Sequence, residues 1–106
     1  MSTEDDPEDT PPKVRKLPHS FMLGGVTIEV RFSDYMPGEY GCYDEGQLAI
    51  FLAAGMPDDL KMEVFWHEVF EAINARFELK LEHPKIQTLA TALLQVLRTS
   101  EDEVPQ

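Results

Sequence analysis

The sequence predicts a small α+β domain in which a three-stranded, mostly antiparallel sheet packs against two α-helices. Its 106 residues are enough for one hydrophobic core and too few for two ordinary domains. Short alternating segments fill the first half of the chain, and two segments of helical periodicity fill the second. We therefore assign residues 19–100 to a single domain. Residues 1–18 are predicted to be a disordered acidic tail, and residues 101–106 an acidic C-terminal tail.

The strand predictions depend on alternation and on the turn residues between segments. Over residues 26–32, apolar side chains alternate with Thr, Glu and Arg, which indicates a half-buried strand after a turn or bulge at Gly24 and Gly25. Residues 40–43 and 47–52 are two shorter runs separated by an Asp-Glu-Gly turn. Short runs joined by tight turns favour antiparallel pairing.

The helix predictions depend on start signals and apolar stripes. Pro57 and the two acidic residues after it mark the start of a helix that runs to about Phe77. Apolar residues recur along it at three- and four-residue steps. The pair His83 and Pro84 opens a second helix that runs to about Thr99.

The net charge of −11 argues against nucleic acid as a direct partner. The N-terminal tail contributes −2 and the C-terminal tail −3, so −6 remains on residues 21–100. Nucleic-acid-binding surfaces need clustered Lys and Arg to displace counterions, and the charge of −6 on residues 21–100 argues against such a surface.

The sequence also predicts a protein of the cytoplasm with no membrane partner. Its first ten residues are acidic where a secretory signal would be basic and then apolar. Nowhere do about eighteen apolar residues run together, as a membrane-spanning helix requires. The single cysteine excludes a Cys-based zinc knuckle, so any metal must be held by His and carboxylate side chains.

The main chemical signal lies in the first predicted helix, where His67 and Glu71 are four residues apart. This spacing places both on one helix face about one turn apart, so the two can share a metal ion. Glu68 follows the first ligand directly, the position at which H-E-x-x-H zinc peptidases carry their general base. Glu71 replaces the second histidine of that motif. Two ligands remain, where a catalytic zinc normally takes three from the protein.

His83 is the candidate third ligand. The six helical residues after Glu71 extend about 9 Å, whereas the six-residue step from Phe77 to His83 can span about 20 Å. The chain can therefore bring His83 back to Glu71. Two imidazoles and one carboxylate are a common ligand set of catalytic zinc. The competing interpretation is that the acidic residues solvate the outer helix face and that His83 caps the second helix.

Three blocks of the chain, residues 66–74, 79–90 and 94–98, resemble a family of small phage and prophage proteins that are similar to minimal zincins. The first block reads Trp-His-Glu-Val-Phe-Glu-Ala-Ile-Asn, and the similarity covers about residues 60–98. The resemblance implies a hairpin sheet packed on two helices. It assigns the site by position: His67, Glu71 and His83 as metal ligands, and Glu68 as the base.

The leading interpretation is a zincin-like metal-binding domain with zinc as its cofactor. It would act as a zinc-dependent peptidase or related hydrolase of phage or prophage origin in the cytoplasm of a bacterial host. Glu68 would take the proton of the attacking water. The partner would be a peptide or protein laid along a sheet edge, with residues 47–52 as the nearest strand.

Two alternatives stay open. The first is a non-catalytic, phage-encoded interaction protein that keeps the zincin-like scaffold and modulates a host factor. The second is an acidic DNA mimic that binds a basic DNA-binding protein. Its carboxylates, however, are interleaved with aromatic and turn residues rather than strung along a surface.

Overall fold

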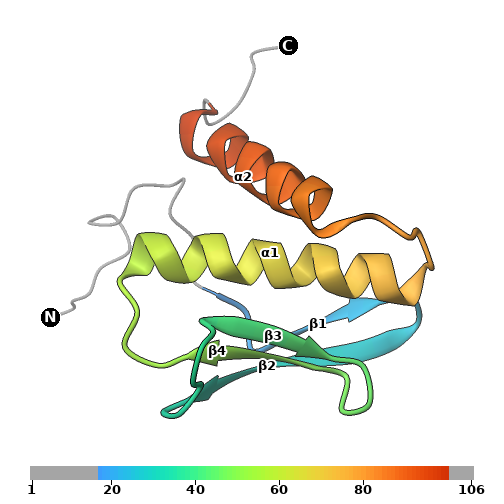
Figure 1. Ribbon diagram of the computed structural model, residues 1–106, viewed down its shortest axis with the longest axis horizontal. Helices are drawn as coiled ribbons and strands as arrows, with labels where there is room; N and C mark the ends of the chain where they lie inside the picture. The colour runs from blue at the N-terminus through green and yellow to red at the C-terminus, as the bar shows by residue number, and fades with distance from the viewer. Residues whose placement is uncertain (1–16, 101–106) are drawn as a thin grey trace, which may run out of the picture.

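The chain forms a sheet covered on one face by helix α1, with helix α2 packed on the far side of α1 (Figure 1). The computed structural model describes residues 17–100. The predicted C-terminal tail and residues 1–16 of the predicted N-terminal tail lie outside this range, while Leu17 packs against the core. The elements are β1 (Ser20–Leu23), β2 (Val26–Ser33), β3 (Gly41–Asp44), β4 (Ala49–Ala53), α1 (Asp58–Arg76) and α2 (His83–Thr99).

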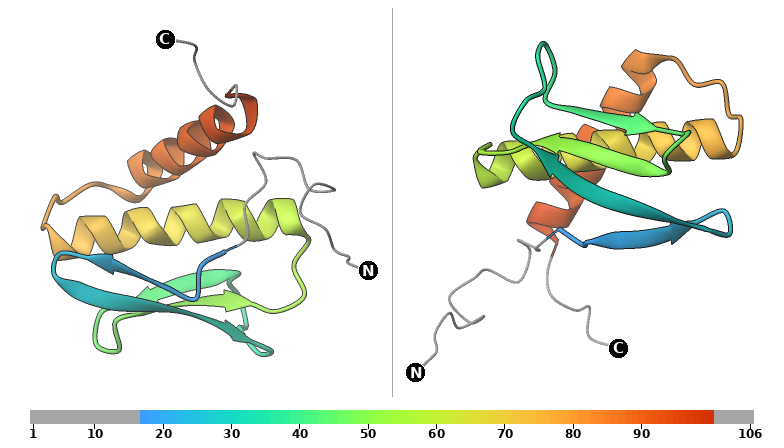
Figure 2. Two further views of the ribbon diagram at one scale, coloured as in Figure 1. Left: turned by 180° about the vertical axis from the view of Figure 1, so that it is seen from behind. Right: turned by 90° about the horizontal axis from the view of Figure 1, so that it is seen from below.

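The predicted α+β class is confirmed, but the sheet has one strand more than the three that were predicted, and one of its three strand pairs is parallel. The sheet has four strands in the order β1-β2-β4-β3. The β1–β2 and β3–β4 pairs are antiparallel, whereas β2 and β4 are parallel, so the sheet is mixed. The chain leaves β2, forms β3 at the edge, and turns back so that β4 lies between them (Figure 2).

Strand β1 is the element that the prediction missed. It has only four residues and joins β2 through Gly24 and Gly25. Both glycines have positive φ, 63° and 83°, a conformation that glycine adopts without steric cost. The predicted turn therefore closes a hairpin.

The core lies between the sheet and α1. Val30 pairs with Ile50 across the parallel β2–β4 ladder, so both side chains point to the same face. Ile28 and Leu52 extend this inner face and are fully buried. From α1 the buried apolar side chains are those of Phe65, Val69 and Ala72.

Both predicted helices are confirmed to within about one residue at their ends. Helix α2 buries Ile86, Ala90 and Leu94, whose four-residue spacing forms one stripe facing α1. Helix α1 is thus covered on two opposite sides. Within residues 17–100, neither helix combines the length and the apolar composition needed to cross a bilayer.

Helix α1 approaches the edge strand β3 closely at Gly41. A Cβ atom at this position would lie 2.6 Å from Cγ1 of Val64, 3.2 Å from Cδ2 of Leu52 and 3.3 Å from Cγ of Glu68. Any other residue must push the helix or its side chains away. The absence of a side chain at Gly41 therefore sets the distance between α1 and β3.

We expect Gly41→Ala to destabilise the fold by about 1–3 kcal/mol, because overpacking forces side chains and backbone to shift. Urea unfolding of the two proteins measures the difference. Gly46→Ala is the matched control, since its added Cβ would meet only a flexible Asp44 side-chain oxygen, at 3.3 Å. Equal stability of wild type and Gly41→Ala would contradict this account.

Candidate metal centre

The three predicted metal ligands lie together at the junction of the two helices. His67 and Glu71 are one turn apart on α1, and His83 is the first residue of α2. The Oε2 atom of Glu71 is 3.2 Å from Nε2 of His67 and 3.1 Å from Nδ1 of His83. The donor atoms of all three residues lie within 4.8 Å of one another. A His-Glu-His group at metal-binding distance is therefore present.

The donor spacing requires a small adjustment to enclose an ion. Zinc bonds of about 2.0–2.1 Å in tetrahedral geometry place neighbouring donor atoms about 3.3 Å apart. The ring of His83 can make this adjustment because its side chain is 70% exposed, whereas the side chain of His67 is 12% exposed and fixed by packing. Two imidazoles and a carboxylate suit zinc and other borderline divalent ions.

The hydrogen bonding of the His67 ring affects its use as a metal ligand. Its Nε2 atom faces Glu71, while its Nδ1 atom is buried and has no hydrogen-bond partner within residues 17–100. When Nε2 binds an ion, the proton of the neutral ring is on Nδ1. Metal-binding histidines usually donate that proton to a carboxylate or carbonyl, and sites without this partner bind more weakly by about 10- to 100-fold.

Glu68, the predicted base, points from α1 toward the sheet and is only 7% exposed. Burial, followed by the charges of Glu71 and Glu39, raises its pKa to about 7, while a backbone hydrogen bond from Tyr43 acts in the opposite direction. A carboxyl group with a pKa near neutrality can both accept and return a proton. The position of Glu68 in the motif predicted its role as a base, but nothing in the sequence predicted that its side chain is buried.

Asn74 holds the link between the helices, a role that the sequence did not predict although Asn74 ends the block of residues 66–74. Its side-chain amide donates to the carbonyl oxygen of Leu81 at 3.2 Å and its side-chain oxygen accepts from the N–H of Leu81 at 2.8 Å. These bonds fold the link back along α1, so that His83 reaches Glu71. An asparagine in the last turn of a predicted helix was the available signal.

The predicted position of a bound peptide changes with the sheet order. Residues 47–52 were expected to form the nearest edge, but β4 lies inside the sheet and its backbone groups pair on both sides. The free edge on this side is β3, which pairs only with β4. This edge strand also lies beside the buried Glu68, through Gly41.

We expect Asn74→Ala to destabilise the protein by about 1–3 kcal/mol, since it leaves two part-buried backbone groups of Leu81 unsatisfied. Hydrogen exchange of the Leu81 amide should become faster. Gln87→Ala, a change on the exposed face of α2, is the control and should stay within about 0.5 kcal/mol. Unchanged exchange at Leu81 would show that Asn74 does not hold the link.

The raised pKa of Glu68 predicts a specific pH dependence for the metal-free protein. Between its unfolded pKa of 4.5 and its folded pKa of about 7, the folded state retains the proton that the unfolded state has lost. The contribution of Glu68 to the free energy of unfolding is therefore largest below pH 4.5 and decreases as the pH rises toward 7. The loss is about 3 kcal/mol once the pH exceeds the folded pKa.

Urea unfolding of wild type and Glu68→Gln in the presence of a chelator tests this dependence. The glutamine variant should gain stability relative to wild type as the pH is raised from 4.5 to 8, because it carries no charge to bury. Parallel pH profiles for the two proteins would show that the carboxyl group is solvated in the folded state.

Comparison of the chain with protein-family models, with curated proteins and with solved structures gives no match.

Proposed function

We propose that this chain is a zincin-like metal-binding domain that acts as a zinc-dependent peptidase. The proposal includes the phage or prophage origin that the resemblance implies and the cytoplasmic location that the sequence predicts. The observation that carries it is the convergence of His67, Glu71 and His83, whose donor atoms lie within 4.8 Å of one another although His83 comes from the second helix. Such convergence suits an ion better than it suits a solvated helix face.

Each residue has a defined role in this proposal. His67, Glu71 and His83 would hold zinc, which when bound acidifies water and polarises a carbonyl group. Glu68 would accept a proton from the attacking water and return it to the leaving amine, as its pKa near 7 permits. Its neighbours on β3 exclude water from one side of the carboxyl group.

The free edge of β3 supports a peptide as the substrate. Its outward backbone N–H and C=O groups have no strand partner within residues 17–100. An extended peptide can add to such an edge through main-chain hydrogen bonds. This would run the peptide past the helix face that carries Glu68.

Metal analysis of the purified protein tests the proposal. We expect one zinc per chain in wild type and its loss in both His67→Ala and His83→Ala, with a zinc-dependent rise in Tm after chelation and zinc return. His19→Ala, which removes a histidine outside the group, is the matched control. Absence of zinc from the wild-type protein at micromolar zinc would overturn the proposed centre.

Peptide cleavage is measured on the same samples. Glu68→Gln should keep zinc and lose turnover by at least about 100-fold, because only the general base is removed. A mass-spectrometric screen of a mixture of peptides with varied sequences detects cleavage at any bond that the protein accepts. Zinc binding with no cleavage in wild type would leave a metal-binding protein that is not a peptidase.

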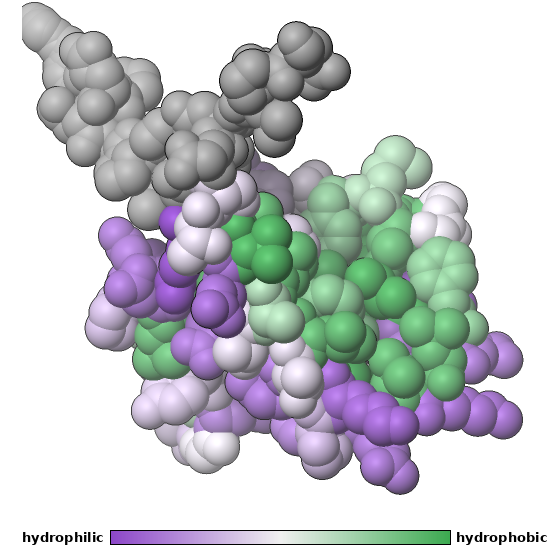
Figure 3. All heavy atoms as spheres, turned by 90° about the horizontal axis from the view of Figure 1, so that it is seen from above, coloured by the Kyte–Doolittle hydropathy of each residue, from purple (hydrophilic) through white to green (hydrophobic). Residues whose placement is uncertain are grey.

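A non-catalytic interaction protein is the second candidate, and an exposed apolar surface favours it. Apolar residues gather over one half of the helical side of the molecule (Figure 3). Large exposed apolar side chains on α2 and on the link before it are those of Phe77, Leu79, Leu89 and Val96. If this function is the correct one, partner binding should be unchanged by Glu68→Gln.

A further inference from the structure

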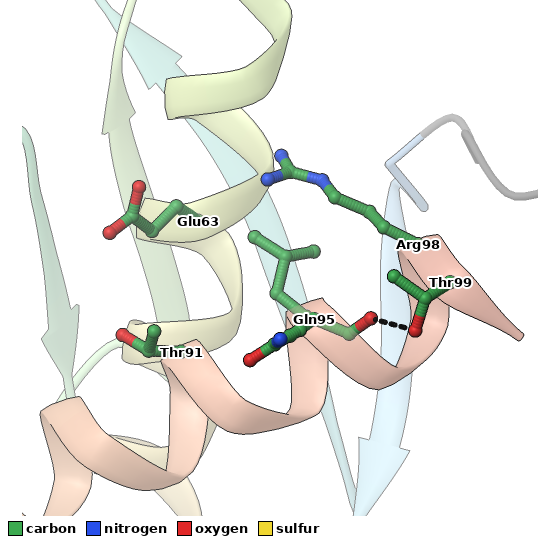
Figure 4. A pocket seen from close by; sticks show the side chains of 6 residues that line it. Glu63, Thr91, Gln95, Arg98 and Thr99 are labelled. Carbon is green, nitrogen blue, oxygen red and sulfur yellow. Dashed lines mark hydrogen bonds between the residues drawn. The ribbon is translucent and has the colours of Figure 1, made fainter.

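A second feature of the helical side is a pocket of about 250 Å³ between α1 and α2. Pockets for whole small molecules usually measure about 300–1,000 Å³, so this one suits a single side chain. Leu94 is buried and gives it an apolar wall. The remaining lining side chains, which come from both helices (Figure 4), are those of Glu63, Thr91, Gln95, Arg98 and Thr99.

The charges in the pocket favour a cation as its occupant. The carboxylate of Glu63 takes part in no hydrogen bond or ion pair within residues 17–100. Arg98 is already engaged, since its Nη2 atom donates to the backbone oxygen of Asp59 at 3.2 Å and lies 3.4 Å from Oδ1 of Asp59. A ligand that enters the pocket therefore meets the unpaired carboxylate of Glu63, whereas the guanidinium group of Arg98 is already paired with Asp59.

The polar residues next to Glu63 can accept further hydrogen bonds from an ammonium or guanidinium group bound to its carboxylate. The side-chain carbonyl of Gln95 is an acceptor that lines the pocket. The hydroxyl oxygen of Thr91 accepts from Nε2 of Gln87 at 3.2 Å and keeps a second lone pair. The surrounding domain adds a favourable electrostatic field, because residues 21–100 carry a net charge of −6. Leu94 suits the methylene stem of a long basic side chain.

The pocket adjoins the candidate metal centre. Glu63 precedes His67 by four residues on α1, so the two lie on the same helix face about 6 Å apart along the axis. An extended peptide advances about 3.3 Å per residue. A side chain seated at Glu63 would therefore belong to a residue about two positions from the one at the metal centre.

We infer that this pocket binds a Lys or Arg side chain of a peptide and that the chain acts on basic peptides. The inference rests on the proposed function for the position of the cleaved bond, but the selectivity of the pocket itself does not require metal. Glu63 is the residue that determines specificity, and Gln95 and Thr91 position the cation.

Binding to the metal-free protein tests the pocket alone. The probes are the N-acetyl, N′-methylamide derivatives of lysine, norleucine and glutamate, titrated against ¹⁵N-labelled protein. We expect the lysine probe to shift the amides of Glu63, Thr91 and Gln95 and to bind at least about 10-fold more tightly than norleucine, which cannot make the charge-assisted hydrogen bond. Equal binding of lysine and norleucine, or preference for glutamate, would overturn the inference.

Variants of one residue make the test specific. Glu63→Gln should abolish the preference for lysine, and Glu63→Lys should turn it toward the glutamate probe. Glu78→Gln removes the same charge from an exposed site on the link and should change nothing. Persistence of the lysine preference in Glu63→Gln would assign it to the net charge of the domain and not to the pocket.

Zinc-loaded protein separates this inference from the proposed function. Cleavage sites of the wild type should carry Lys or Arg at one fixed distance from the broken bond, and Glu63→Gln should lose that preference while retaining zinc. If the protein cleaves peptides without preferring Lys or Arg, the inferred cation pocket is overturned and the proposed peptidase function is supported. If the protein binds the lysine probe selectively but binds no zinc, the inferred cation pocket is supported and the proposed peptidase function is overturned.

Discussion

The close packing of α1 against β3 at Gly41 is the contact on which the rest of the structure depends. A Cβ atom there would be 2.6 Å from Val64, so only glycine allows the helix to lie this near the sheet edge. The same approach buries Glu68 and raises its pKa to about 7. With the sheet on one side and α2 on the other, α1 keeps only its flanks for polar side chains. Glu63, His67 and Glu71 follow one another at four-residue steps, so the candidate metal ligands of α1 and the proposed cation pocket share one helix face.

The helices were predictable because their signals are local. Pro57 and Pro84 mark the two starts, and the apolar spacing of each helix fixes its buried face. The sheet order was not predictable in this way. Parallel pairing of β2 with β4 is decided by tertiary packing after β3 has been placed at the edge, and no local residue pattern encodes it. Strand β1 was not predictable because its four residues give too short an alternation.

In the candidate site, too, local spacing predicts one part of the arrangement and tertiary packing decides the other. Helix geometry alone brings His67 and Glu71 together, and the length of the link allows His83 to return. The sequence could not show what makes it return. Glu78 and Lys80 adopt left-handed φ values of 53° and 60°, which non-glycine residues rarely do, and the Asn74 side chain bonds to the chain just beyond them. Such a conformation depends on contacts made after both helices have packed.

The contact of His83 with Glu71 joins residues that are 12 apart in the chain. An ion held by both would close this segment into a ring, as a disulfide does, and rings of about 15 residues are stabilised by about 3 kcal/mol through the restricted unfolded chain. Because α2 begins at His83, the ion would anchor the start of that helix. The free energy with which α2 docks on α1 would then depend on the ion concentration.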